Sequence, residues 1–163
     1  MKIDYKRKRK GKTDYKARMG MLKSGLPRVV IRKTNKFIYV QYVKSVEARD
    51  KAIFTVSSRD LLEKGWAKES KGSLKSVSAA YLTGYLAGKE IISKDKKGKV
   101  ILDIGLERNV AGSRLYGALK GLVDAGVNIS YDEKAFPKKE RLEGKHLKKD
   151  AQVLMNKVKE NIK

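Results

Sequence analysis

Residues 28–43 read RVVIRKTNKFIYVQYV, and this stretch decides the fold. Two runs of β-branched and aromatic residues, 28–33 and 37–43, flank a polar turn at 33–36, which is the pattern of a β-hairpin. Asn35 suits the left-handed backbone conformation that tight turns favour. Apolar side chains alternate onto both faces of the second run. We therefore expect helices to cover one face and a partner or the N-terminal segment to cover the other.

The residues that follow supply the elements that complete a domain around this hairpin. The pattern predicts strands at 52–58, 100–104 and 127–130, and helices at 73–89 and 113–123. Ser73 is the expected N-cap of the first helix, and Gly126 ends the second. Gly84 and Gly88 keep the first helix slim, which suits close packing on a sheet. The order βββαβαβ predicts an α/β domain with a mixed β-sheet packed with helices.

The composition divides the chain into three parts. We expect a basic arm at 1–25, an α/β core domain at 26–130, and a charged linker with a C-terminal amphipathic helix at 131–163. A short helix is predicted within the arm at 14–22. The C-terminal helix has one apolar stripe, made of Leu147, Ala151, Leu154, Met155, Val158 and Ile162. This stripe predicts that the helix docks on the domain or on a partner.

The charge of the chain restricts the class of partner. The 163 residues contain 40 Lys and Arg against 18 Asp and Glu, a formal net charge of +22. Such an excess predicts binding to RNA, DNA or an anionic membrane surface. The chain has no cysteine, so disulfides, thiol chemistry and cysteine-ligated zinc are excluded. No apolar run approaches the length of a membrane span, and we expect a soluble intracellular protein.

The arm carries the densest charge, because every residue from 6 to 12 except Gly11 is a lysine or an arginine. These cations repel one another, and the arm has almost no large apolar side chain to bury in compensation. A solvated, disordered tail is the simplest interpretation of such a segment. The charge continues through Lys16 and Arg18 into the first strand, however. We therefore favour an arm that binds nucleic acid, because an external polyanion relieves the repulsion and releases counterions.

Three motifs resemble functional sites but lack the necessary context. The residues Gly-Lys-Thr at 11–13 resemble the end of a phosphate-binding loop, but the glycine required five residues before Gly11 is Lys6 in this chain. Asp103 could serve a metal-dependent nuclease, yet no second strand-borne carboxylate accompanies it, so a structural role is expected. His146 is the single histidine and lies in a charged segment. The sequence therefore predicts no enzyme and no cofactor.

Taken in order, several segments resemble one known family. They are residues 5–9, 13–18, 28–36, 81–84 and 112–121. The chain resembles the archaeal form of the large-subunit ribosomal protein family that binds 5S ribosomal RNA. The resemblance spans nearly the whole chain, including a C-terminal extension that bacterial members lack.

The resemblance implies a structural role in the large ribosomal subunit. Family members bind 5S rRNA, attach it to the subunit in the central protuberance, and also contact 23S rRNA. The implied partners are these two RNAs and neighbouring large-subunit ribosomal proteins, with no membrane and no small-molecule substrate. The implied RNA-binding residues are Lys6, Arg7, Lys8, Arg9, Lys10, Lys12, Lys16, Arg18, Arg32, Lys33, Asn35 and Lys36, with Arg114 and Tyr116 as further candidates.

Two other classes remain open at this point. A general nucleic-acid chaperone or DNA-compacting protein would bind duplex DNA as well as it binds 5S rRNA. A nuclease would use Asp103 in metal-dependent RNA cleavage.

Overall fold

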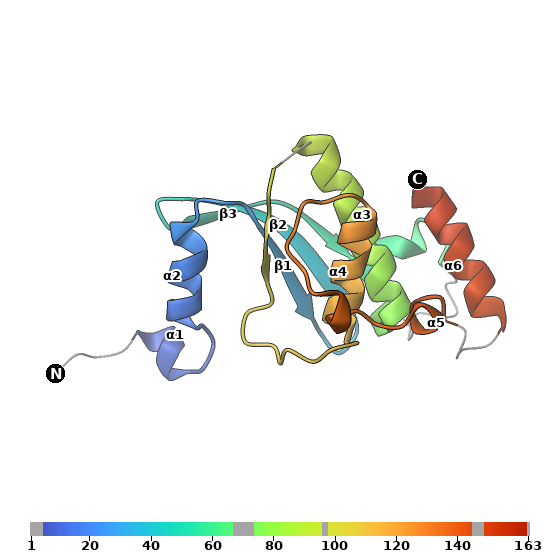
Figure 1. The fold of residues 1–163 in the computed structure, drawn as a ribbon, viewed down its shortest axis with the longest axis horizontal. Coiled ribbons are helices and arrows are strands. Elements are labelled where there is room, and N and C mark those ends of the chain that lie inside the picture. The colour runs from blue at the N-terminus through green and yellow to red at the C-terminus, as the bar shows by residue number, and fades with distance from the viewer. Residues whose placement is uncertain (1–4, 67–73, 96–97, 145–148, 163) are drawn as a thin grey trace.

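The computed structural model describes residues 5–66, 74–95, 98–144 and 149–162. A β-sheet lies at the centre, with helices α3 (Val77–Lys94) and α4 (Arg114–Asp124) on one face. The N-terminal helices α1 (Lys6–Arg9) and α2 (Tyr15–Lys23) lie on the other side of the sheet (Figure 1). This arrangement confirms the predicted α/β class.

The sheet is mixed and has the strand order β3-β2-β1-β4. Its strands are β1 (Arg28–Lys33), β2 (Ile38–Val46), β3 (Arg49–Ser57) and β4 (Ile101–Asp103). The first three pair antiparallel, and β4 pairs parallel to β1. The strand predicted at 127–130 is wrong, since this segment makes only one isolated bridge, between Ile129 and Val100. The chain then turns into a short 3-10 helix, Glu133–Ala135, which Asp132 caps.

The two hairpin turns differ from the prediction. In the β1–β2 turn, Thr34 fixes the backbone: its Oγ1 accepts from Phe37 N (2.9 Å) and donates to Phe37 O (2.9 Å). Asn35 therefore does not adopt the left-handed conformation expected of it. That conformation occurs instead at Glu47 (φ 50°) and Ala48 (φ 63°), which form the two-residue turn between β2 and β3. The sequence did not predict this second turn because neither residue is the asparagine or glycine that marks such turns.

Helices α3 and α4 pack so closely that their backbones touch. A Cβ atom on Gly84 would overlap the backbone carbonyl oxygen of Ala118, and one on Gly121 would overlap the carbonyl oxygen of Tyr81. Gly84 and Gly88 therefore face α4, and not the sheet as expected. The expected N-cap, Ser73, lies outside the described residues. Helix α3 begins at Val77, where the Ser76 side chain caps it.

Two apolar clusters hold these layers together. The larger one fills the space between the sheet and the helices α3 and α4. The smaller one joins α3 to the 3-10 helix η1 (Ser58–Leu62), to α5 (Lys139–Leu142) and to the C-terminal helix α6 (Lys149–Ile162). Met155, Val158 and Ile162 of the predicted stripe are buried in this cluster. Helix α6 therefore docks on the domain, as one of the two sequence-based alternatives predicted.

Candidate nucleic-acid interface

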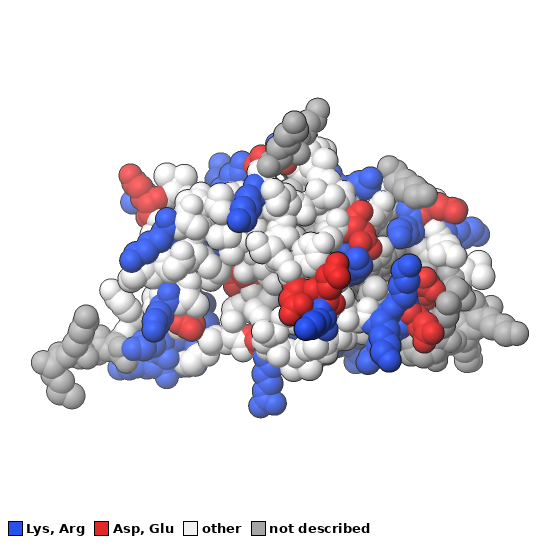
Figure 2. Space-filling view, in the orientation of Figure 1, with Lys and Arg blue, Asp and Glu red and all other residues white. Residues whose placement is uncertain are grey.

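The N-terminal arm is built as two short surface helices. Asp14 begins α2, because its Oδ1 accepts from the backbone N of Lys16 (2.9 Å) and of Ala17 (3.1 Å). The Tyr5 ring lies 5.0 Å from the Tyr15 ring and brings α1 close to the start of α2. Basic side chains gather at the lower left of Figure 2, where the arm lies. The predicted contacts that are solvent-exposed here are Lys6, Arg7, Lys8, Arg9, Lys10, Lys12 and Lys16.

A chain of alternating charges joins this arm to the sheet. Arg18 of α2 lies 2.8 Å from Asp50 of β3, and Asp50 lies 2.6 Å from Arg28 of β1. Asp103 of β4 then accepts from Arg28 (3.2 Å) and from Arg32 (3.1 Å). The Arg28 side chain is only 3% exposed, so its two carboxylate partners compensate for the loss of water around it. This charge network, Arg18–Asp50–Arg28–Asp103–Arg32, fixes where the arm lies.

The environment of Asp50 keeps it ionised. Burial raises the pKa of this carboxyl group, but hydrogen bonds from Ser45, Arg18 and Arg28 outweigh that effect and lower the pKa below its ordinary value of 3.8. The Ser45 hydroxyl donates to Asp50 Oδ1 (2.6 Å) and accepts from Arg28 Nη2 (3.1 Å). Asp50 therefore remains a fixed negative charge between two arginines at neutral pH.

A cationic cleft of about 340 Å³ lies between the arm and the sheet. Arg7 and Lys12 line it from the arm side, and Arg32 lines it from β1. The Arg7 side chain donates to Thr13 Oγ1 (2.9 Å), which orients its guanidinium group. The structure thus brings Arg32 together with the arm cations, although the two are far apart in sequence. Cations from two sides can follow a phosphate backbone laid between them.

The other predicted residues lie outside this cleft. Asn35 and Lys36 are exposed at the β1–β2 turn. Lys33 is paired with Glu107 (2.7 Å). At the start of α4, Arg114 donates to the backbone carbonyl of Lys75 (3.3 Å), and the Tyr116 hydroxyl donates to Asn109 Oδ1. The predicted set therefore divides into the arm, the end of β1 with Arg32 and Lys33, the β1–β2 turn, and the start of α4.

Arg59 and Lys75 complete the surface at the β1–β2 turn, and sequence reasoning missed both. Together with Asn35 and Lys36 they line a pocket of about 510 Å³. Arg59 lies in η1, just after β3, and Lys75 precedes α3. Neither belongs to a basic run, so only the folded chain brings them to the turn.

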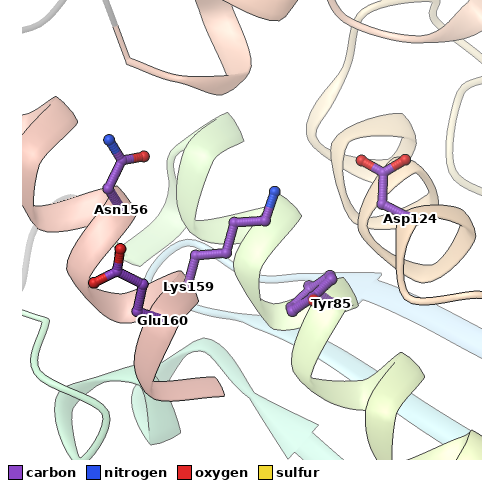
Figure 3. Close-up of a pocket in the computed structure, with 5 residues that line it drawn as sticks. All are labelled: Tyr85, Asp124, Asn156, Lys159 and Glu160. Carbon is purple, nitrogen blue, oxygen red and sulfur yellow. The ribbon is translucent and has the colours of Figure 1, made fainter. Parts of the chain in front are cut away.

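A different kind of pocket, of about 520 Å³, lies between α3, α4 and α6. In Figure 3, Lys159 extends from α6 towards Tyr85 and Asp124. Its Nζ atom donates to the Tyr81 hydroxyl (2.9 Å), which in turn donates to Asp124 Oδ2 (3.0 Å). Burial and the nearby Asp124 charge raise the pKa of Tyr81. These hydrogen bonds connect α6 to α3 and α4. Because acidic and basic side chains both line the pocket, it does not suit a polyanion.

The contacts of Asp103 distinguish between the structural role and the metal-dependent nuclease role considered for this residue. Both of its carboxylate oxygens are occupied by arginines, and Oδ1 also accepts from Gly105 N (2.8 Å). Within the described part of the chain, no group of three His, Cys, Asp or Glu residues could hold a metal ion. Asp103 therefore pairs arginines, as the structural interpretation predicted. His146 lies outside the described residues.

This α/β domain has an exposed cationic arm, and the carboxylates Asp50 and Asp103 hold the network arginines in place. It has the construction of a structural nucleic-acid-binding protein. Comparison with known proteins agrees with this class. The chain belongs to the family described as ribosomal large subunit proteins 60S L5 and 50S L18, whose family model matches residues 1–100 and 90–132. This result confirms the resemblance found in the sequence.

Curated relatives carry the same description. The chain is 40% identical to the large ribosomal subunit protein uL18 of Aeropyrum pernix, over 94% of this chain and 70% of the relative. It is 40% identical to the Korarchaeum cryptofilum protein of that name, over 94% and 76%. For the Methanoculleus marisnigri protein the identity is 43%, over 89% and 80%. The chain is thus a structural, non-enzymatic protein of the large ribosomal subunit.

None of its described helices is long and apolar enough to cross a membrane.

Proposed function

We propose that this chain binds 5S rRNA and attaches it to the large subunit in the central protuberance, with further contact to 23S rRNA. The observation that carries the proposal is the exposed cationic arm, which the charge network holds against the sheet. An arm that is fixed through Arg18, and whose lysines are exposed to solvent, can follow a phosphate backbone without refolding the domain. Family membership supports ribosomal RNA as the polyanion.

In this proposal the three parts of the chain have different tasks. The arm at 1–25 supplies most of the affinity, because its cations neutralise phosphates. The α/β core at 26–130 supplies shape discrimination through Arg32, Asn35 and Lys36, since folded RNA is recognised mostly by its shape and its 2′-hydroxyl groups. Arg32 and Lys33 are already paired, with Asp103 and Glu107, so each contributes only through the exposed part of its side chain. Arg114 and Tyr116 are peripheral contacts in this scheme.

The salt dependence of 5S rRNA binding tests the arm. Each lost phosphate contact lowers the log–log slope of affinity against salt by about 0.7–0.9. We expect deletion of residues 1–24 to weaken binding strongly and to flatten this slope. A Lys→Gln change at positions 6, 8, 10 and 12 should lower the slope by about 3, if each lysine meets one phosphate. This variant leaves Arg18 and the charge network intact.

Two controls make the test decisive. A Lys→Arg change at the same four positions keeps the charge and should keep the slope of the wild-type protein. Duplex DNA as a competitor separates 5S rRNA recognition from general polyanion binding, which the proposal excludes as the main role. An unchanged slope in both the deletion and the Lys→Gln variant would refute the role of the arm.

A further inference from the structure

The pocket at the β1–β2 turn has an apolar floor and a cationic rim. Phe37 and Leu62 lie partly buried at the floor, where they pack against the smaller apolar cluster, and Leu74 is fully buried there. Lys36 and Arg59 are exposed at the rim. The turn built by Thr34 holds the Phe37 backbone at both its N–H and C=O groups, and the Phe37 side chain packs against the smaller apolar cluster.

The charged residues among the described lining of this pocket all have one sign. Its described lining residues include the cations Lys36, Arg59 and Lys75 and no carboxylate. Lys75 is held near the start of α4, since its carbonyl accepts from Arg114. Asn35 adds a side-chain amide that can donate to and accept from a base edge. A flat aromatic group with an attached negative charge matches this combination of floor and rim.

We propose that this pocket holds one unstacked nucleotide of ribosomal RNA, with its base against the Phe37 ring and its phosphate among Lys36, Arg59 and Lys75. The proposal rests on the proposed RNA binding and adds a second contact site to it. Aromatic side chains stack on splayed-out bases in single-stranded loops and bulges, where sequence-specific RNA recognition occurs. The volume of about 510 Å³ falls within the range that small ligands occupy in protein pockets.

The second site is separate from the arm and its cleft. The arm is anchored at Ala48 and Asp50, beyond the end of β2, whereas Lys36 precedes the start of β2. The cleft beside the arm reaches along β1 to Arg32, but it shares no described lining residue with the pocket at the turn. We therefore expect a substitution in the pocket to leave the contacts of the arm in place.

Ultraviolet cross-linking followed by mass spectrometry tests the pocket directly. In one experiment the 163-residue chain is bound to 5S rRNA, and in a parallel experiment it is bound to 23S rRNA. Trypsin then releases FIYVQYVK, residues 37–44. We expect a nucleotide adduct on Phe37 with one of the two RNAs, and no such adduct in the Phe37→Leu variant. Leucine keeps an apolar group at the floor, so the domain should remain folded.

Affinity measurements provide a second readout. For the RNA that cross-links, Phe37→Leu should bind about tenfold more weakly, since a stacked base contributes a factor of this order. Arg59→Gln should lower the salt slope by about 0.7 if it removes one phosphate contact. Lys157→Gln, at an exposed position on α6, makes the same change in charge and should leave the slope unchanged.

The possible outcomes separate this proposal from the proposed function. If the wild-type protein binds 5S rRNA while Phe37→Leu keeps full affinity for both RNAs, the pocket proposal is overturned and the arm assignment stands. It is also overturned if Arg59→Gln and Phe37→Leu bind both RNAs normally but fail to join the large subunit, because the occupant is then a protein. If the wild-type protein does not bind 5S rRNA, the proposed function fails. The experiment with 23S rRNA alone then tests whether the pocket holds a nucleotide.

Discussion

The charge network predicts a large stability loss on Asp103→Asn. This change keeps the size of the side chain and removes its negative charge, leaving Arg28 and Arg32 without a common partner. Asp103 is 7% exposed, and the Arg28 side chain is 3% exposed. Water therefore cannot easily replace the lost carboxylate around Arg28. Arg32 is 40% exposed and can be rehydrated, so most of the loss comes from Arg28.

The expected magnitude follows from that difference. Removing one partner of a buried ion pair costs about 3–5 kcal/mol of folding free energy. Arg28 keeps its contact with Asp50, which places the cost for Asp103→Asn near the lower limit, about 3 kcal/mol. A single domain has roughly 5–15 kcal/mol of stability in total, so the variant should fold but unfold at markedly lower denaturant concentration.

Urea unfolding followed by circular dichroism measures this loss. The matched control is Glu107→Gln, which makes the same chemical change in the Lys33–Glu107 pair, whose side chains are 34% and 27% exposed. A pair this exposed contributes at most about 1 kcal/mol. If Asp103→Asn costs no more than Glu107→Gln, Arg28 does not depend on Asp103 and the reasoning about the network is wrong.

Two further predictions concern the helix pair and the arm contact. Gly121→Ala should lower the melting temperature, because the added methyl group overlaps Tyr81 O. The cost of this overlap exceeds the roughly 1 kcal/mol by which alanine stabilises a helix relative to glycine. A rise in melting temperature would contradict the observed contact. The lowered pKa of Asp50 means that its stabilising effect is present above its unfolded-state pKa near 3.8 and is lost as pH falls through the folded-state pKa. Between pH 6 and pH 2.5, the free energy of unfolding should therefore fall less in Asp50→Asn than in the wild-type protein. The difference should be less than about 1 kcal/mol, because Asp50 is 31% exposed. An equal fall in both proteins would exclude Asp50 as a source of the acid sensitivity.

Local patterns predicted the elements whose signals lie within a few residues. The strand at 28–33 and the helix at 113–123 are found within one residue of their expected limits. A run of β-branched residues marks the strand, and helical spacing of apolar residues followed by Gly126 marks the helix. Contacts between distant segments were not predictable in this way. Arg32 was expected to contact RNA, but its ion pair with Asp103, 71 residues later, was not expected. No local pattern connects these two positions.

The same limit applies to the candidate site. The arm could be predicted because its cations are adjacent in sequence and need no fold to bring them together. The pocket at the β1–β2 turn depends on Arg59 of η1 and on Lys75, which precedes α3. Only the packing of η1 and α3 beside the turn places these two cations around Phe37.

The backbone contact between α3 and α4 divides the chain into regions with opposite tolerance to mutation. At Gly84 and Gly121 every other residue adds a Cβ atom that meets main-chain atoms, so even the smallest substitution is penalised. In the arm, by contrast, lysine and arginine can be exchanged at many positions if the total charge is kept. Saturation mutagenesis of this chain should therefore find almost no tolerated substitution at the contacting glycines of α3 and α4. In the arm it should find many positions at which lysine and arginine can be exchanged.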